Sequence, residues 1–216
     1  MTRLTPVVQN LIIVNVLVFV FLLLIRQQIL PVSLEILQFF VLIKPNYFGL
    51  HGPEIGSHGF LLVQIVSSFF THFEVFHILF NMLALASLGV AMELSMGSRR
   101  FFRLYFFSGI FAGLLIAFLD PLDGIVIGAS TAVSGVLAGF AIQFPTAPLS
   151  VFFLPPIQAR KLLIGLSAIS AVLVGLQLAR VDLGGLGSIS HFGHLAGIGS
   201  GVLYFQLEKW WPVLRR

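Results

Sequence analysis

The chain has 216 residues, of which 58% are hydrophobic and only 9% are charged, and its mean hydropathy is +1.05. A soluble domain carries about 25% charged residues, so this composition excludes an ordinary soluble protein and indicates one that crosses a membrane several times. The net charge of +4 is spread over the ends of apolar segments and forms no single stripe, which argues against a nucleic-acid partner. The absence of cysteine excludes disulfides, thiol chemistry and thiolate metal sites.

Six apolar segments approach the roughly 20 residues that a helix needs to cross a bilayer. They lie at 7–25, 76–95, 100–119, 130–145, 161–179 and 190–207. The first is longer than the apolar part of a cleaved signal and no cleavage pattern follows it, so we expect a first spanning helix. The sequence therefore predicts an all-α membrane protein, a single domain over residues 1–216 built as a six-transmembrane-helix bundle.

The connection between the first two predicted helices, residues 26–75, is unusually long. It contains two apolar runs, 34–43 and 60–70, each too short to cross a membrane. Non-helical backbone at membrane depth must be buried in protein or lie against water. We therefore expect a long first loop that is partly embedded in the membrane.

Basic residues divide unequally between the two sides of the predicted bundle. One side carries three, Arg26, Lys44 and Arg180, and the other carries nine: Arg3, Arg99, Arg100, Arg103, Arg160, Lys161, Lys209, Arg215 and Arg216. Cytoplasmic loops are enriched in Lys and Arg, so both termini are predicted to be cytoplasmic. A short chain without targeting extensions suits the plasma membrane of a prokaryote, and the sequence does not indicate the oligomeric state.

This topology brings four polar residues to one depth. Predicted helices two, four and six run in the same direction, from the outer side to the cytoplasm. His77 and Asn81 lie near the start of the second, Ser130 starts the fourth, and His194 lies near the start of the sixth. At 1.5 Å per residue, all four fall within roughly the outer third of a ~30 Å hydrocarbon core.

Ser130 opens the fourth predicted helix, in the sequence Gly128-Ala129-Ser130-Thr131. Considered locally, a serine in this place is a common helix cap. The first N–H groups of a helix have no partner within it and the helix dipole is positive there, so an oxyanion could be held beside a Ser130 nucleophile. Ser134, one turn later on the same face, is a reserve nucleophile whose small side chain also suits packing between helices.

His194 is the candidate general base. A histidine inside a membrane is costly and indicates a functional site, and a neutral imidazole can accept the proton of a serine. Gly193 and Gly197 flank His194, and glycines at this spacing allow close contact between helices. We therefore expect the sixth helix to approach the fourth closely enough for a hydrogen bond between Ser130 and His194.

His77 and Asn81 are four residues apart and share one helical face. They either donate hydrogen bonds to an oxyanion or join helices as a polar pair, and His72 either belongs to the same group or marks the membrane interface. No acidic residue lies inside a span at the depth of His194, so a Ser–His dyad is favoured over a triad. His72 and His77 are five residues apart and lack the spacing of a His-Glu-x-x-His motif, so neither a metal nor another cofactor is predicted.

Four of these motifs together resemble the rhomboid family of intramembrane serine proteases. In chain order they are Thr71-His72-Phe73…His77-Ile78-Leu79-Phe80-Asn81, Glu93…Gly97-Ser98, Gly128-Ala129-Ser130 and Gly193-His194-Leu195-Ala196-Gly197. The resemblance implies six helices around a water-filled cavity open to the outside. It also implies that Ser130 is the nucleophile, that His194 is the base, and that His77, Asn81 and the Ser130 amide stabilise the oxyanion. The family often has glycine directly after the serine, where this chain has Thr131.

The sequence therefore predicts an intramembrane serine endopeptidase that cleaves transmembrane segments of membrane proteins within the lipid bilayer, without a cofactor. The alternative is a catalytically weak or inactive rhomboid-fold protein that binds membrane proteins. A third possibility, a small transporter with His77 and His194 as a proton relay, lacks the inverted repeat typical of many transporters.

Overall fold

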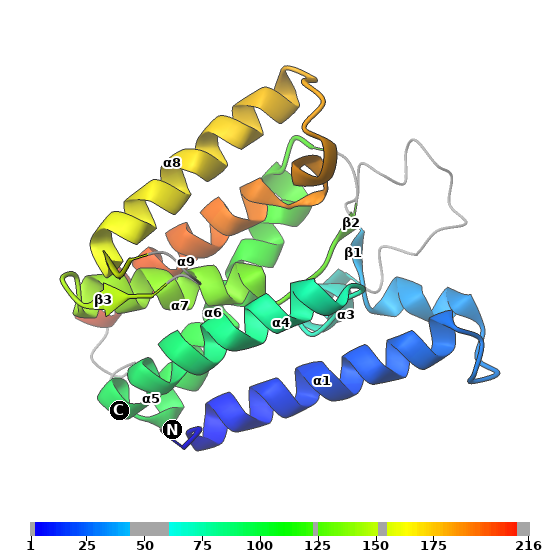
Figure 1. Cartoon of the computed structure of the whole chain (residues 1–216), viewed down its shortest axis with the longest axis horizontal. Coiled ribbons are helices and arrows are strands. Elements are labelled where there is room, and N and C mark those ends of the chain that lie inside the picture. Colours follow the sequence, from blue (N-terminus) through cyan, green and yellow to red (C-terminus); the bar gives the residue numbers. More distant parts are fainter. Residues whose placement is uncertain (1–2, 44–60, 123–124, 151–154, 211–216) are drawn as a thin grey trace.

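The structure is a computed structural model that describes residues 3–43, 61–122, 125–150 and 155–210. These residues form a bundle made mostly of helices (Figure 1). The main helices are α1 (Pro6–Arg26), α4 (Val75–Ala84), α5 (Val90–Met96), α6 (Ser98–Leu119), α7 (Ser130–Gln143), α8 (Ala159–Leu178) and α9 (His191–Trp210). A π-helical turn, η3 (Leu85–Gly89), joins α4 to α5 in one continuous helix. The six predicted helical ranges fall on these helices.

Four helices in the described part of the chain are long and apolar enough to cross a membrane. They cover Pro6–Arg26, Val75–Met96, Ser98–Leu119 and Ala159–Leu178. The shorter α7 is also apolar, with 14 residues, whereas α9 has 20 residues that include two histidines and four glycines. The prediction of a helical, multi-pass membrane protein is confirmed.

Two short antiparallel strand pairs correct the all-α prediction. β1 (Leu42–Ile43) pairs with β2 (Ile125–Val126), and β3 (Pro148–Leu149) pairs with β4 (Ile157–Gln158). β1 lies in the predicted first loop, and β2 leads into the start of α7. Buried backbone groups need partners wherever water is excluded, and strand pairing supplies them to segments that are too short and irregular for a helix.

The described part of the first loop contains two other short elements, the 3₁₀-helix η1 (Leu34–Phe39) and the helix α3 (Leu61–Ser68). Buried Gln64 of α3 donates a hydrogen bond of 3.0 Å to the Gln38 carbonyl, and the Ser67 hydroxyl donates one to the Phe39 carbonyl. Neither element is long enough to cross a membrane. The rest of this loop, residues 44–60, lies outside the described residues.

α7 and α9 pack with their backbones in contact. A Cβ atom built on Gly197 would lie 2.1 Å from the Thr131 carbonyl oxygen, and one built on Gly201 would lie 2.3 Å from the Gly135 carbonyl oxygen. The contacts advance together along both helices, from Gly193 beside Thr131 to Gly201 beside Gly135, so α7 and α9 run parallel. The predicted close contact through glycines is confirmed.

A buried carboxylate ties three helices together at the opposite end of the bundle from the start of α7. Glu93 in α5 accepts hydrogen bonds from the hydroxyls of Thr5 and Ser98, both at 2.6 Å, and from the N–H groups of Val7 and Val8, at 3.1 and 3.0 Å. The Thr5 side chain makes no cap of its own. Glu93 therefore satisfies the free N–H groups at the start of α1 and links that helix to α5 and α6.

A second contact closes the same end of the bundle. The guanidinium of Arg100 donates two hydrogen bonds to the Glu208 carboxylate, from Nε at 3.1 Å and Nη2 at 2.9 Å, which joins the start of α6 to the end of α9. The Tyr204 hydroxyl donates to the Arg100 carbonyl at 3.4 Å. The start of α1 and the end of α9 therefore lie at one end of the molecule (Figure 1).

Replacing Glu93 with alanine should destabilise the fold. The change leaves buried hydroxyl and N–H donors without an acceptor, at an expected cost on the order of 3 kcal/mol in the free energy of unfolding. Thermal unfolding of the purified protein in detergent measures the effect. Glu74→Ala is the matched control, because Glu74 is exposed and makes no side-chain cap. An unfolding temperature unchanged by Glu93→Ala would contradict the role of this carboxylate.

Alanine at Gly197 should separate α7 from α9. The new Cβ would overlap the Thr131 backbone, and overpacking against backbone should cost about 3 kcal/mol, the upper end of the usual range. Gly199→Ala in the same helix is the control, because a Cβ there meets nothing within 4 Å. We expect Gly199→Ala to be neutral or stabilising by up to about 1 kcal/mol. Equal unfolding temperatures for the two variants would show that the contact is looser than described.

Candidate active site

Ser130 is the first residue of α7 and is half-buried. The cap position is Ala129, and no side chain caps the helix, so the interpretation of Ser130 as a helix cap is wrong. Within the described residues, the Ser130 hydroxyl takes part in no hydrogen bond. It lies beside the unpaired N–H groups of the first turn of α7, where partial positive charge accumulates.

The turn that precedes Ser130 depends on Gly128. Its φ is +108°, a backbone conformation that side-chain-bearing residues rarely adopt. A Cβ at this position would lie 2.6 Å from both Cε1 and Nε2 of His77. The Gly128 N–H donates to the Ser68 carbonyl at 2.8 Å. The turn is therefore held by α3 on one side and lies against the His77 ring on the other.

His72 belongs to this group, which decides a question that the sequence left open. It is buried, and its Nε2 accepts a hydrogen bond of 3.3 Å from the Ala129 N–H. Its ring lies edge-on to the His77 ring, with 4.8 Å between the centroids. Burial and, secondly, the charge of a protonated His77 lower the pKa of His72 to about 3. A neutral ring is what the contact requires, because Nε2 must keep its lone pair.

Asn81 and His77 lie in α4 at the end of the bundle that contains Ser130. Asn81 is buried, and its Nδ2 donates to the His77 carbonyl one turn earlier, at 3.0 Å. This bond uses one of the two N–H groups of the Asn81 amide and leaves the other available. His77, which is half-buried, contacts the Gly128 turn through its ring.

His194 lies in the first turns of α9, between the two glycines that contact Thr131. The ring of His194 lies edge-on to the ring of His191, with 6.1 Å between the centroids. His191 is also held by the backbone, because its Nε2 lies 3.0 Å from the Leu186 carbonyl oxygen. No hydrogen bond joins Ser130 to His194 within the part of the chain that the structure describes.

Thr131, the residue at which the family often has glycine, is buried against α9. Its hydroxyl oxygen lies 3.3 Å from the place where a Cβ on Gly193 would stand. Thr131 also lines a cavity of about 10 Å³ together with Gly128 and Ile116. This volume holds about one water molecule. The larger water-filled cavity implied by the resemblance stays a prediction.

Sequence reasoning missed a contact at the C-terminal end of α1. The guanidinium of Arg26 donates a hydrogen bond of 3.0 Å to the Phe73 carbonyl and lies over the Phe73 ring, 4.7 Å from its centroid. Phe73 follows His72 directly, so Arg26 restrains the loop that carries His72. The only signal in the sequence was a basic residue at the end of the first span, on the side with few basic residues.

The described residues contain no group of three or more His, Asp or Glu side chains placed to hold a metal ion. His72 contacts His77, and His191 contacts His194. In each pair, one ring also contacts a backbone group. Chemically, the arrangement brings together a hydroxyl at a helix start, a turn held by neutral groups, and imidazoles from two helices.

Comparison with known proteins identifies the family. The model of the rhomboid domain matches residues 60–209. Rhomboid protein 1, mitochondrial, of Saccharomyces cerevisiae is 34% identical over 148 residues, which are 66% of this chain and 40% of that protein. RHOMBOID-like protein 4 of Arabidopsis thaliana is 31% identical over 140 residues, covering 65% of this chain and 32% of that protein.

A third relative, Rhomboid-like protease 3 of Toxoplasma gondii, is 29% identical over 165 residues, which are 72% of this chain and 58% of that protein. The chain thus spans less than two thirds of the length of each of these relatives. Because the rhomboid model matches well over half of the chain, the resemblance carried by the four motifs is confirmed and the protein belongs to the rhomboid family.

Proposed function

We propose that the protein is an intramembrane serine endopeptidase in which Ser130 is the nucleophile and His194 the general base. The observation that carries this proposal is the parallel contact of α7 with α9, in which Thr131 packs against Gly193 and Gly197. Ser130 precedes Thr131, and His194 lies between the two glycines. The two proposed catalytic residues therefore lie at the same level along two parallel helices that are in contact. One relative, that of Toxoplasma gondii, is itself named a protease.

In the proposed reaction, His194 takes the proton of the Ser130 hydroxyl as the serine oxygen bonds to the carbonyl carbon of the substrate. The carbonyl oxygen becomes an oxyanion. When the C–N bond breaks, protonated His194 returns its proton to the leaving amine, and the acyl group stays on Ser130. Water then attacks the acyl-enzyme with His194 again as base and releases the second product.

The oxyanion needs donors that are already in place. We assign this role to the Ser130 amide, to His77 and to the second N–H of Asn81. The contact of His77 with the Gly128 turn supports the assignment, since it puts the ring next to the backbone that leads to Ser130. Fixed donors in a water-poor site stabilise developing charge strongly, and loss of one such donor costs about 10²–10³ in kcat in a comparable site.

Transmembrane proteins are the proposed substrates, and they must enter from the bilayer. A helical segment hides its carbonyls in its own hydrogen bonds, so local unwinding at Gly or Pro should favour cleavage. We propose α8 and the first loop as the gating elements. α8 buries only two residues of its 20, Ala159 and Ser170, and it stands at the edge of the bundle (Figure 1).

We further propose that α7 and α9 also cross the membrane, which makes six spans with both termini in the cytoplasm. The position of the start of α1 and the end of α9 at one end of the bundle supports this topology. The comparisons do not support the predicted membrane, the plasma membrane of a prokaryote. The three relatives compared are eukaryotic, and one is named mitochondrial, so the prokaryotic plasma membrane stays a prediction without their support.

The competing function is a rhomboid-fold protein that binds membrane proteins and cuts them weakly or not at all. The absence of a hydrogen bond between Ser130 and His194 within the described residues favours keeping this alternative. A serine-directed fluorophosphonate probe distinguishes the two. Labelling that requires Ser130 supports the peptidase, and absence of labelling in a folded sample supports the binder.

Ser130→Ala should abolish cleavage of a transmembrane substrate in proteoliposomes. Loss of a serine nucleophile lowers kcat by roughly 10⁶ in a well-studied serine protease, so product should fall below detection. Ser134→Ala is the matched control. Ser134 lies one turn along α7, and its Cβ packs 3.1 Å from a Cβ built on Gly197. Undiminished cleavage by Ser130→Ala, or loss of cleavage in Ser134→Ala alone, would overturn the assignment.

His72→Ala should lower kcat with little effect on KM. It removes the acceptor of the buried Ala129 N–H and the ring that supports His77, and an unsatisfied buried donor costs about 1–3 kcal/mol. His72→Gln keeps an acceptor near the position of Nε2 and should restore part of the rate.

The pH dependence of kcat distinguishes a positioning role of His72 from a role in proton transfer. With a pKa of about 3, wild-type His72 stays neutral over an assay range of roughly pH 5 to 9. The pH profile of His72→Gln should therefore keep the wild-type shape at a lower rate. Loss of the acid limb of the profile would show that His72 itself titrates during turnover.

A further inference from the structure

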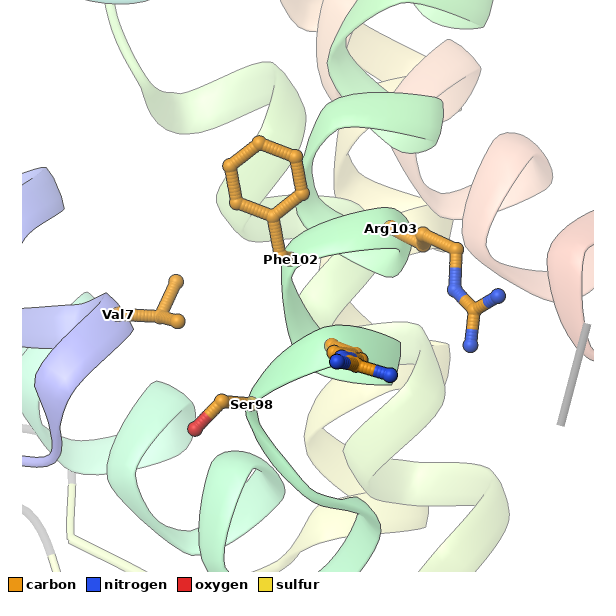
Figure 2. Close-up of a pocket in the computed structure, with 5 residues that line it drawn as sticks. Val7, Ser98, Phe102 and Arg103 are labelled. Carbon is orange, nitrogen blue, oxygen red and sulfur yellow. The ribbon is translucent and has the colours of Figure 1, made fainter. Parts of the chain in front are cut away.

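An open cavity of about 400 Å³ lies at the end of the bundle remote from Ser130. It is lined by Val7 at the start of α1 and by Ser98, Arg99, Phe102 and Arg103 in the first turns of α6. Figure 2 shows Val7 facing the turns of α6 that carry Ser98 and Phe102, with Arg103 on the next turn after Ser98. No step of the proposed peptidase reaction uses this cavity.

The charge at the cavity is positive. Arg99 is exposed, and within the described residues it forms no hydrogen bond or ion pair. Arg103 follows it by four residues and so lies on the same face of α6. Arg100, between them, is already bound to Glu208. The acid in α5, Glu93, accepts hydrogen bonds from four other donors and forms no ion pair with Arg99 within the described residues.

The rest of the lining is apolar. Phe102 is 47% exposed, and Val7 faces it from α1. Both helices are long and apolar enough to cross a membrane, so their ends at this cavity lie at the height of a bilayer surface. A cationic site that continues into an apolar one at that height is complementary to an anionic headgroup attached to acyl chains. It is less suited to a water-soluble anion, which would not use Phe102 and Val7.

We propose that this cavity binds an anionic phospholipid, with the phosphate group at the guanidinium groups of Arg99 and Arg103 and the first part of an acyl chain along Phe102 and Val7. Arginine forms strong paired hydrogen bonds with phosphate, and the cytoplasmic leaflet, on the predicted side of these residues, carries the anionic lipids. The bound lipid bridges α1 and α6 beside the Glu93 contacts. It therefore stabilises the fold, and this holds whether or not the protein is a peptidase.

Purified full-length protein in a neutral detergent provides the test. Dioleoyl phosphatidylglycerol or dioleoyl phosphatidylcholine is added at equal mole ratio, and thermal unfolding and lipid retention by native mass spectrometry are measured. Phosphatidylglycerol should raise the unfolding temperature more than phosphatidylcholine. Arg99→Gln with Arg103→Gln should remove this difference and weaken phosphatidylglycerol binding by about 30-fold, which corresponds to about 2 kcal/mol for two basic residues.

The matched control is Arg160→Gln with Lys161→Gln, which removes the same charge at the start of α8, on the same predicted side but outside the cavity. It should bind phosphatidylglycerol like the wild type. If the double variant at α6 does not fold, Arg99→Gln alone is used, because this side chain is exposed. The proposal is overturned if the two lipids act equally, if the control loses as much binding, or if inorganic phosphate reproduces the stabilisation.

Discussion

Backbone contact between α7 and α9 is the constraint on which the proposed site depends. Lipid offers no hydrophobic driving force between helices, so such contacts rely on small residues and close packing. α6 adds a third helix to the contact, because a Cβ on Gly135 would lie 2.3 Å from Ser108 Oγ. Each residue along a helix turns the side chain by about 100°. A register shift of one residue in α9 would therefore turn Gly193, Gly197 and Gly201 away from α7 and would change the direction of His194 as well.

The two ends of the bundle are held in different ways. At the Glu93 end, charged side chains accept or donate several hydrogen bonds at once. At the Ser130 end, the turn is held by single contacts to the Ser68 carbonyl and to His72, with a strand pair of two residues behind it. This difference suits the proposed function, in which a substrate enters between helices at the Ser130 end, since local opening is easiest where few contacts must break.

Much of this architecture could be predicted, because it rests on patterns local to each helix. Apolar length gave the helical ranges, and the spacing of Gly193, Gly197 and Gly201 predicted the contact with α7. The contacts around Ser130 could not be predicted in the same way. The Ala129 N–H meets His72 across 57 residues of chain, and β1 meets β2 across the whole of α4 to α6. Such pairings depend on how loops fold over the bundle, which neither hydropathy nor periodicity encodes.

The distribution of charge in the chain suits the proposed dyad, which contains no carboxylate. Moving a carboxylate into a medium of low dielectric costs several kcal/mol unless donors surround it. The buried carboxylates Glu93 and Glu208, at the far end of the bundle, each accept several hydrogen bonds, and buried Asp120, at the end of α6, accepts one from the Leu122 N–H. The groups that contact the turn before Ser130 can all be neutral at rest: the Ser68 carbonyl, the His77 ring, and the His72 ring, which accepts a hydrogen bond. In the proposed reaction, charge then appears only as the oxyanion and the imidazolium form together. The N–H groups at the start of α7 then stabilise the oxyanion. In the resting site they have no such charge to stabilise, so the stabilisation is specific to the transition state.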